Sequence, residues 1–150
     1  MPQFRDYPEA TSILPGDAFL IDRPGVGTMY ILESATNFST IYDIAMGFPE
    51  TIPPNVVILA FNVVRPIYLP AGLTGSEFSL QTAPSSDFVL TLLQNGNTIG
   101  TVDFPASSLV GTPTFAAKVT FAAGDEIRIQ TPSSTYGALG FSCTLAATRL

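Results

Sequence analysis

The stretch from Asp87 to Phe104, DFVLTLLQNGNTIGTVDF, constrains the fold more than any other part of this sequence. Two runs rich in β-branched, aromatic and leucine residues flank Asn95-Gly96-Asn97, a pattern typical of a β-hairpin. A three-residue loop over 95–97, with Asn97 left-handed, gathers the large apolar side chains on one face of both strands. The pairs that it predicts are Phe88 with Phe104, Leu90 with Val102, Leu92 with Gly100, and Thr91 with Thr101. A two-residue Asn95-Gly96 loop would instead set Phe88 against Asp103, so we favour the three-residue loop.

The composition indicates one domain with few charges. The chain has 150 residues, of which 46% are hydrophobic and 12% are charged, about half the usual charged share. Its longest apolar run, residues 56–61, is far shorter than the roughly 20 residues that cross a bilayer. The formal net charge of −6 argues against nucleic-acid binding, which needs a basic face. Low charge with ordinary apolar content favours a surface covered by other protein chains, although a well-packed monomer with a Ser/Thr-rich surface fits the same composition.

The N-terminal third is expected to form a separate module. Residues 1–16 contain three prolines without periodicity and are predicted to be an extended arm. Strands are predicted over 18–22 and 28–33, around a glycine-rich turn. Apolar residues then fall at helical spacing between Thr36 and Met46, which predicts one short amphipathic helix. The run FPETIPPN, residues 48–55, has too many prolines for regular structure, so the domain boundary is placed after residue 54.

Residues 55–150 have the pattern of a β-sandwich. The run 56–64 is apolar on both faces and predicts a central strand. A second hairpin is predicted between 114–121 and 125–131, pairing Val119 with Ile127, Ala117 with Ile129 and Lys118 with Arg128. Alternation over 139–147 predicts a last strand with one core face. About eight short strands and a single helix signal predict an all-β fold, an antiparallel jelly-roll-like sandwich carrying the N-terminal arm, small hairpin and short helix.

No group of residues in the sequence points to catalysis, a cofactor or a metal. The chain has no His, so the commonest general base and transition-metal ligand is missing. The single cysteine, Cys143, is expected to be a buried small apolar residue. Asp103, Asp125 and Glu126 are interpreted as solvated hairpin residues, since no calcium-loop spacing is present. Tyr136, in the loop PSSTYG, is a candidate for contact with a partner.

Several stretches of the chain resemble bacteriophage virion proteins. The run RPIYLPAGLTGS, residues 65–76, is similar to the opening of a small β-sandwich in phage tail-fibre and head-decoration proteins. The similarity continues, in order, through 82–84, 87–90, 94–96, 99–104, 120–125 and 141–145. The run DAFLIDR, residues 17–23, with the glycine turn, strand and helix after it, resembles a module of phage appendage and decoration proteins.

The resemblance implies a virion structural protein, usually a homotrimer, without catalytic residues. Long fibres attach this sandwich to extended shafts, whereas here it follows an arm and a small module, which favours a stand-alone part. We therefore expect a capsid decoration (cement) protein, assembled in the host cytoplasm, whose residues 1–54 bind the major capsid protein or a neighbouring subunit. The residues expected to make these contacts are Phe4, Arg5, Tyr7, Ile13, Leu14 and Phe19. The alternative is a tail-fibre or tail-appendage protein whose sandwich loops, Tyr136 among them, bind a host receptor glycan.

Overall fold

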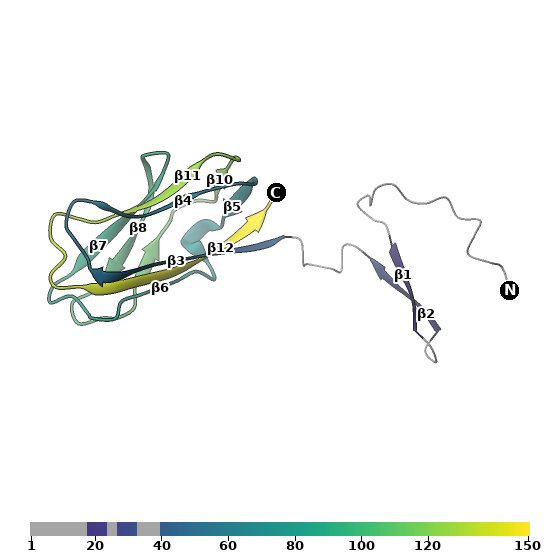
Figure 1. Ribbon diagram of the computed structural model, residues 1–150, viewed down its shortest axis with the longest axis horizontal. Coiled ribbons are helices and arrows are strands. Elements are labelled where there is room, and N and C mark those ends of the chain that lie inside the picture. Colours follow the sequence, from purple (N-terminus) through teal and green to yellow (C-terminus); the bar gives the residue numbers. More distant parts are fainter. Residues whose placement is uncertain (1–17, 24–26, 33–39) are drawn as a thin grey trace. The chain divides into compact units, whose positions relative to one another are not determined.

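The computed structural model describes residues 18–23, 27–32 and 40–150, and the chain divides into two units, 1–39 and 40–150 (Figure 1). In the described part of the first unit, β1 (Ala18–Arg23) pairs antiparallel with β2 (Gly27–Leu32). These strands confirm the two that the sequence predicts there. The arm expected over 1–16 lies outside the described residues.

The second unit consists of two antiparallel sheets that face each other as a sandwich (Figure 1). Its strands are β3 (Ile41–Thr51), β4 (Val57–Asn62), β5 (Ile67–Leu69), β6 (Glu77–Ser79), β7 (Phe88–Gln94), β8 (Asn97–Phe104), β9 (Thr112–Thr114), β10 (Val119–Phe121), β11 (Glu126–Gln130) and β12 (Leu139–Arg149). One sheet has the order β10-β5-β12-β3, with β6 also paired to β12; the other has the order β4-β11-β7-β8-β9. A short 3₁₀ turn, Ala71–Leu73, follows β5. The predicted all-β antiparallel sandwich is confirmed.

The core lies between the sheets and is centred on three phenylalanines. Phe88 and Phe104 come from the β7–β8 hairpin, and Phe141 comes from β12 in the facing sheet. The ring centroids of Phe88 and Phe104 are 5.5 Å apart, and those of Phe104 and Phe141 are 6.2 Å apart in an edge-on arrangement. All three side chains are buried. Burial of one phenylalanine side chain contributes roughly 1.5–3 kcal/mol, and contacts between rings add to this. Because the rings come from both sheets, the cluster holds the two sheets together.

The β7–β8 hairpin confirms the predicted strand pairing but not the predicted loop. Phe88 lies opposite Phe104, as expected, and the other three predicted pairs are present as well. However, Gln94 lies opposite Asn97, so the turn contains only Asn95 and Gly96, with φ of 50° and 87°. Two successive positive φ values are typical of a type I′ turn. The register then shifts between Leu92 and Leu93, and this bulge restores the pairing that a three-residue loop would give.

The helix predicted between Thr36 and Met46 is wrong for the residues that the structure describes. Residues 41–51 form β3, whose inward side chains alternate with period two and lie opposite the inward side chains of β12. Ile44, for example, is buried opposite Leu145. Pairing along the whole of β12 outweighs the local helical spacing. Pro49 is tolerated because β3 is an edge strand and its register shifts beside Gly140.

This strand also changes the division of the chain. Because β3 pairs with β12, residues 41–51 belong to the sandwich, and the two units meet between Ser39 and Thr40 rather than after residue 54. The proline-rich run 48–55, expected to be irregular, supplies the end of β3 and the connection to β4.

The predicted second hairpin is also wrong. A turn does occur at 122–124, where Gly124 has φ of 94°, but it carries the chain from one sheet to the other. β10 pairs with β5, whereas β11 lies between β4 and β7. Lys118 therefore lies over the ring of Tyr68, 3.7 Å from its centroid, instead of opposite Arg128.

The strand predicted to be central over 56–64 is an edge strand. β4 pairs only with β11 among the described strands. The run is apolar but partly open to solvent, since the side chains of Val56, Val57 and Val64 are 39%, 44% and 67% exposed. An apolar run on both faces therefore marks an uncovered edge here, not deep core.

Candidate functional site

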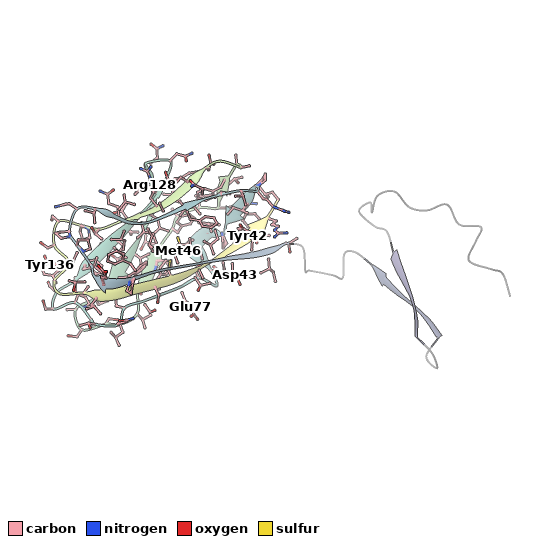
Figure 2. All side chains as sticks on the ribbon, in the orientation of Figure 1. Tyr42, Asp43, Met46, Glu77, Arg128 and Tyr136 are labelled. Carbon is pink, nitrogen blue, oxygen red and sulfur yellow. The ribbon has the colours of Figure 1, made fainter. Side chains whose placement is uncertain are left out.

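The outer face of the β12 sheet carries a shallow hollow of about 430 Å³. It is lined by Ala45, Met46, Gly47, Glu77, Ser79, Ser142, Cys143 and Thr144. The hollow crosses three neighbouring strands, with β12 in the middle, β3 on one side and β6 on the other. Figure 2 shows Met46 and Glu77, on β3 and β6, near the middle of this sheet.

The strand register explains why the face is hollow. Thr144 lies between Ala45 and Glu77, and the next outward position along β12 is Ser142. Ser142 lies between Gly47 and Ser79. The small residues of β3 leave space that larger outward side chains would fill, because outward positions of paired strands are only about 4.5–5.5 Å apart.

The hollow offers hydrogen-bonding groups rather than an activated nucleophile. The hydroxyls of Ser79 and Ser142 bond to each other, with 2.8 Å between their oxygens. The chain contains no His that could take a proton from either hydroxyl. In the part of the chain that the structure describes, no three His, Cys, Asp or Glu side chains gather where they could hold a metal ion. This face therefore offers hydroxyl groups and the Glu77 carboxylate for polar contact.

Cys143 lies under this face, on the inward side of β12, and is 5% exposed, as predicted. Burial raises the pKa of its thiol to about 12, and a hydrogen bond with the Met46 backbone opposes this only partly. Because the folded-state pKa lies above the ordinary value near 9, the folded state favours the protonated thiol. The stability from this group is complete below about pH 9 and declines as the pH rises toward 12.

We therefore expect Cys143 to resist alkylation by iodoacetamide at pH 8 in the folded protein and to react once urea unfolds the chain. The measurement is the mass of the protein after timed exposure. A Ser142→Cys variant is the matched control, because the neighbouring outward position is exposed and its thiol should react without unfolding. Rapid alkylation of Cys143 in the folded wild type would contradict this picture.

Tyr136 lies in a hydrogen-bonded loop at one end of the sandwich (Figure 2). Its side chain is 45% exposed and its φ is 50°, a left-handed conformation that is uncommon for a residue of this size. The Tyr136 carbonyl accepts hydrogen bonds from the backbone N–H and the hydroxyl of Ser85, at 2.9 and 3.2 Å. The adjacent Thr135 hydroxyl donates to the Ile52 carbonyl at 2.8 Å. Such backbone strain persists where surrounding contacts impose it, and it is frequent at contact sites.

The loop of Tyr136 and the start of the sandwich lie at opposite ends. Figure 2 shows Tyr136 at one end, and Tyr42, near the beginning of β3, toward the other. The last strand returns to the starting end, because the Arg149 N–H donates to the Thr40 carbonyl at 2.7 Å. Tyr136 is therefore presented far from the point where the first unit joins the sandwich.

Two of the three candidate carboxylates, Asp125 and Glu126, have local partners in the structure. Both oxygens of Asp125 accept hydrogen bonds: from the Asn95 amide at 2.8 Å, from the Gln94 amide at 3.0 Å and from the Ala122 N–H at 2.8 Å. These bonds, that of Asn95 first, lower the pKa of Asp125. Glu126 forms an ion pair with Arg128 at 2.6 Å. Asp125 thus ties two turns together instead of simply facing solvent.

The structure brings none of the predicted N-terminal contact residues into a described site. Phe4, Arg5, Tyr7, Ile13 and Leu14 lie outside the described residues. Phe19 lies in β1 opposite Ile31, which fixes its backbone position only. Within the described ranges no helix has the length and apolar character needed to cross a membrane.

The hollow on the β12 sheet is the feature that sequence reasoning missed. The signal was present: Asp43, Ala45 and Gly47 alternate with Ile44, Met46 and Phe48 at period two. Interpreting the same residues as a helix removed β3 from the sheet and with it one wall of the hollow.

No protein-family model matches this sequence, and no curated protein matches it either. The fold and the geometry described above are therefore the structural basis for a functional proposal.

Proposed function

We propose that this chain is a phage capsid decoration protein, a trimeric knob that binds the capsid shell through its N-terminal segment. The observation that carries the proposal is the resemblance of residues 65–149, in order, to the sandwich of phage head-decoration and tail-fibre proteins. That stretch lies wholly within a β-sandwich that forms its own unit.

The organisation of the chain supports a role in binding. The first 39 residues form a separate unit and supply the candidate capsid contacts, and the sandwich supplies a self-contained folded body. The outer face of the β12 sheet offers small and hydroxyl side chains suited to contact. Contacts of modest strength become effective when many copies are repeated on one shell, because linked binding events multiply.

The test is binding to capsid shells assembled without this protein. Deleting residues 1–16 should abolish cosedimentation with the shells, while far-UV circular dichroism still shows a folded sandwich. The matched control, Tyr136→Ala, should bind the shells as the wild type does. Full binding by the deletion variant would overturn the proposal, and a virion count of only a few copies would contradict a shell location.

A second candidate is a tail-fibre or tail-appendage protein that binds a host receptor glycan through its loops. The observation that favours it is Tyr136, since an exposed ring on a hydrogen-bonded loop suits stacking against a sugar. Here Tyr136→Ala should abolish binding of the isolated protein to host cells, while deletion of 1–16 should not. The two candidates thus predict opposite results from the same pair of variants.

A further inference from the structure

The strands at the sheet edges of the described sandwich differ in how they are protected. Natural proteins prevent edge-to-edge pairing with short strands, prolines and charges. β9 and β10 have three residues each, and β9 contains Pro113. β3 carries two carboxylates, Asp43 and Glu50, besides Pro49. β4, with the sequence VILAFN, has neither a charge nor a proline.

The free side of β4 presents backbone groups in a known order. The Val63 N–H donates to the Asp125 carbonyl at 2.8 Å, and the Val63 carbonyl accepts from the Gly124 N–H at 2.7 Å. Backbone groups of alternate residues in an antiparallel ladder point to opposite sides. Those of Phe61 therefore face β11, and those of Ala60 and Asn62 face away from the sheet.

The sequence around β4 is free of charge in an acidic protein. Residues 51–64 contain no Asp, Glu, Lys or Arg, whereas the chain carries a formal charge of −6. Identical copies of such a chain repel one another, so a contact between copies is least opposed where no carboxylates meet. At β4 the exposed valines 56, 57 and 64 would also lose contact with water.

We propose that β4 is a docking edge for a second copy of this chain, which pairs with it antiparallel about a two-fold axis at Phe61. A two-fold contact uses the same surface on both partners, and a strand paired with its own copy satisfies this requirement. In this register Ala60 of one copy exchanges both backbone hydrogen bonds with Asn62 of the other. The two five-stranded sheets become one continuous sheet.

The charges beside β4 are compatible with this register. Arg128 lies opposite Ala60, and Glu126 lies opposite Asn62, on the neighbouring strand β11. With the axis at Phe61, Ala60 of one copy lies opposite Asn62 of the other. The line that runs across the strands through this pair then ends at Arg128 in one copy and at Glu126 in the other, which carry opposite charges. With the axis at Ala60, that line would hold two Arg128 side chains. The first arrangement places no like charges on this line, whereas the second places two there.

The inference rests on the edge strand alone and holds whether or not the chain decorates a capsid. If the knob is trimeric, a two-fold contact joins subunits of different knobs, because three copies around one axis cannot also pair in twos within the same knob. Failure of capsid binding and failure of self-association are therefore separate results.

Sedimentation velocity over a concentration series of the full chain tests the contact. The wild type should reach twice the mass of its basic unit as the concentration rises. Within one copy, the new carboxylate of Ala60→Glu lies beside Arg128, which has the opposite charge. Across the contact, the two new carboxylates lie diagonal to each other and repel, so the dissociation constant should rise about tenfold or more. Thr114→Glu, on the protected edge β9, should associate as the wild type does. Identical masses for the wild type and Ala60→Glu at every concentration would overturn the proposal.

Cross-linking tests the register independently of affinity. Residues that face each other across the axis in a non-hydrogen-bonded pair have Cβ atoms about 4.5–5.5 Å apart, within reach of a disulfide when the backbones adjust slightly. Phe61→Cys should therefore form a covalent dimer on mild oxidation, whereas Ala60→Cys should not. A disulfide through residue 60 and none through residue 61 would overturn the proposed arrangement. Cys143 is buried and does not compete.

Discussion

Phe104→Ala is expected to lower the free energy of unfolding by about 3–5 kcal/mol, the range for removing a buried phenylalanine ring. The Phe104 side chain is 1% exposed and contacts rings from both sheets, with Phe88 at 5.5 Å and Phe141 at 6.2 Å. The cavity left behind lies between two sheets that other side chains hold apart, so the core cannot close around it. Urea unfolding followed by circular dichroism measures the loss.

Val89→Ala is the matched control for this substitution. Val89 lies on the same hairpin as Phe104 but on its outward face, and it is 37% exposed. Its truncation should cost about 0.5 kcal/mol or less. A loss for Phe104→Ala no larger than this would contradict the picture of a cluster that joins the sheets. A double-mutant cycle with Phe141→Ala should show coupling between the two sheets, since the rings are in contact.

Gly100→Val should also be strongly destabilising, because it adds a side chain where there is no room for one. A Cβ atom at position 100 would lie 2.5 Å from a ring carbon of Phe115 and 2.8 Å from the backbone oxygen of Thr114. The ring can turn, but the oxygen belongs to β9, which is paired with β8, and it can move only if that pairing yields. We expect a loss of about 1–3 kcal/mol in the free energy of unfolding.

The control for this prediction is Thr98→Val, an exposed position on the same strand. It should change the free energy of unfolding little. Hydrogen exchange in Gly100→Val should be fastest at the amides of β8 and β9, because the clash forces these strands apart. Wild-type stability with unchanged exchange would show that β9 does not lie as closely against Gly100 as the structure has it.

Where one face of a strand is buried, the sequence predicts the structure well. In the β7–β8 hairpin, alternation alone selects the pairing of Phe88 with Phe104, because a slip by one residue would turn every large side chain outward. The loop type was not determined in the same way. A two-residue turn with a bulge and a three-residue loop give the same pairs beyond Leu92, so burial cannot distinguish them.

Pairings between strands that lie far apart along the chain could not be predicted. Residues 41–46 fit a helix locally and become a strand only because β12 offers a complementary face. The turn at 122–124 is compatible with a hairpin, yet each flanking strand finds a better partner in a different sheet. The hollow on the β12 sheet and the open edge at β4 both depend on these long-range pairings, so a local pattern such as the alternation over 43–48 could indicate a strand but not the strand that pairs with it.

The pairing of the first and last strands of the sandwich has a consequence for how the protein is made. β3 is the first strand of the sandwich to be synthesised, but its only partner strand among the described residues, β12, is the last strand of the sandwich to leave the ribosome. Until then β3 has no ladder, and the sheet that it completes cannot close. The second sheet, built from strands nearer to one another in the chain, can begin to assemble first. The apolar residues of β3, including Ile44, therefore remain uncovered on the nascent chain until β12 has emerged, a period in which chaperones can bind them.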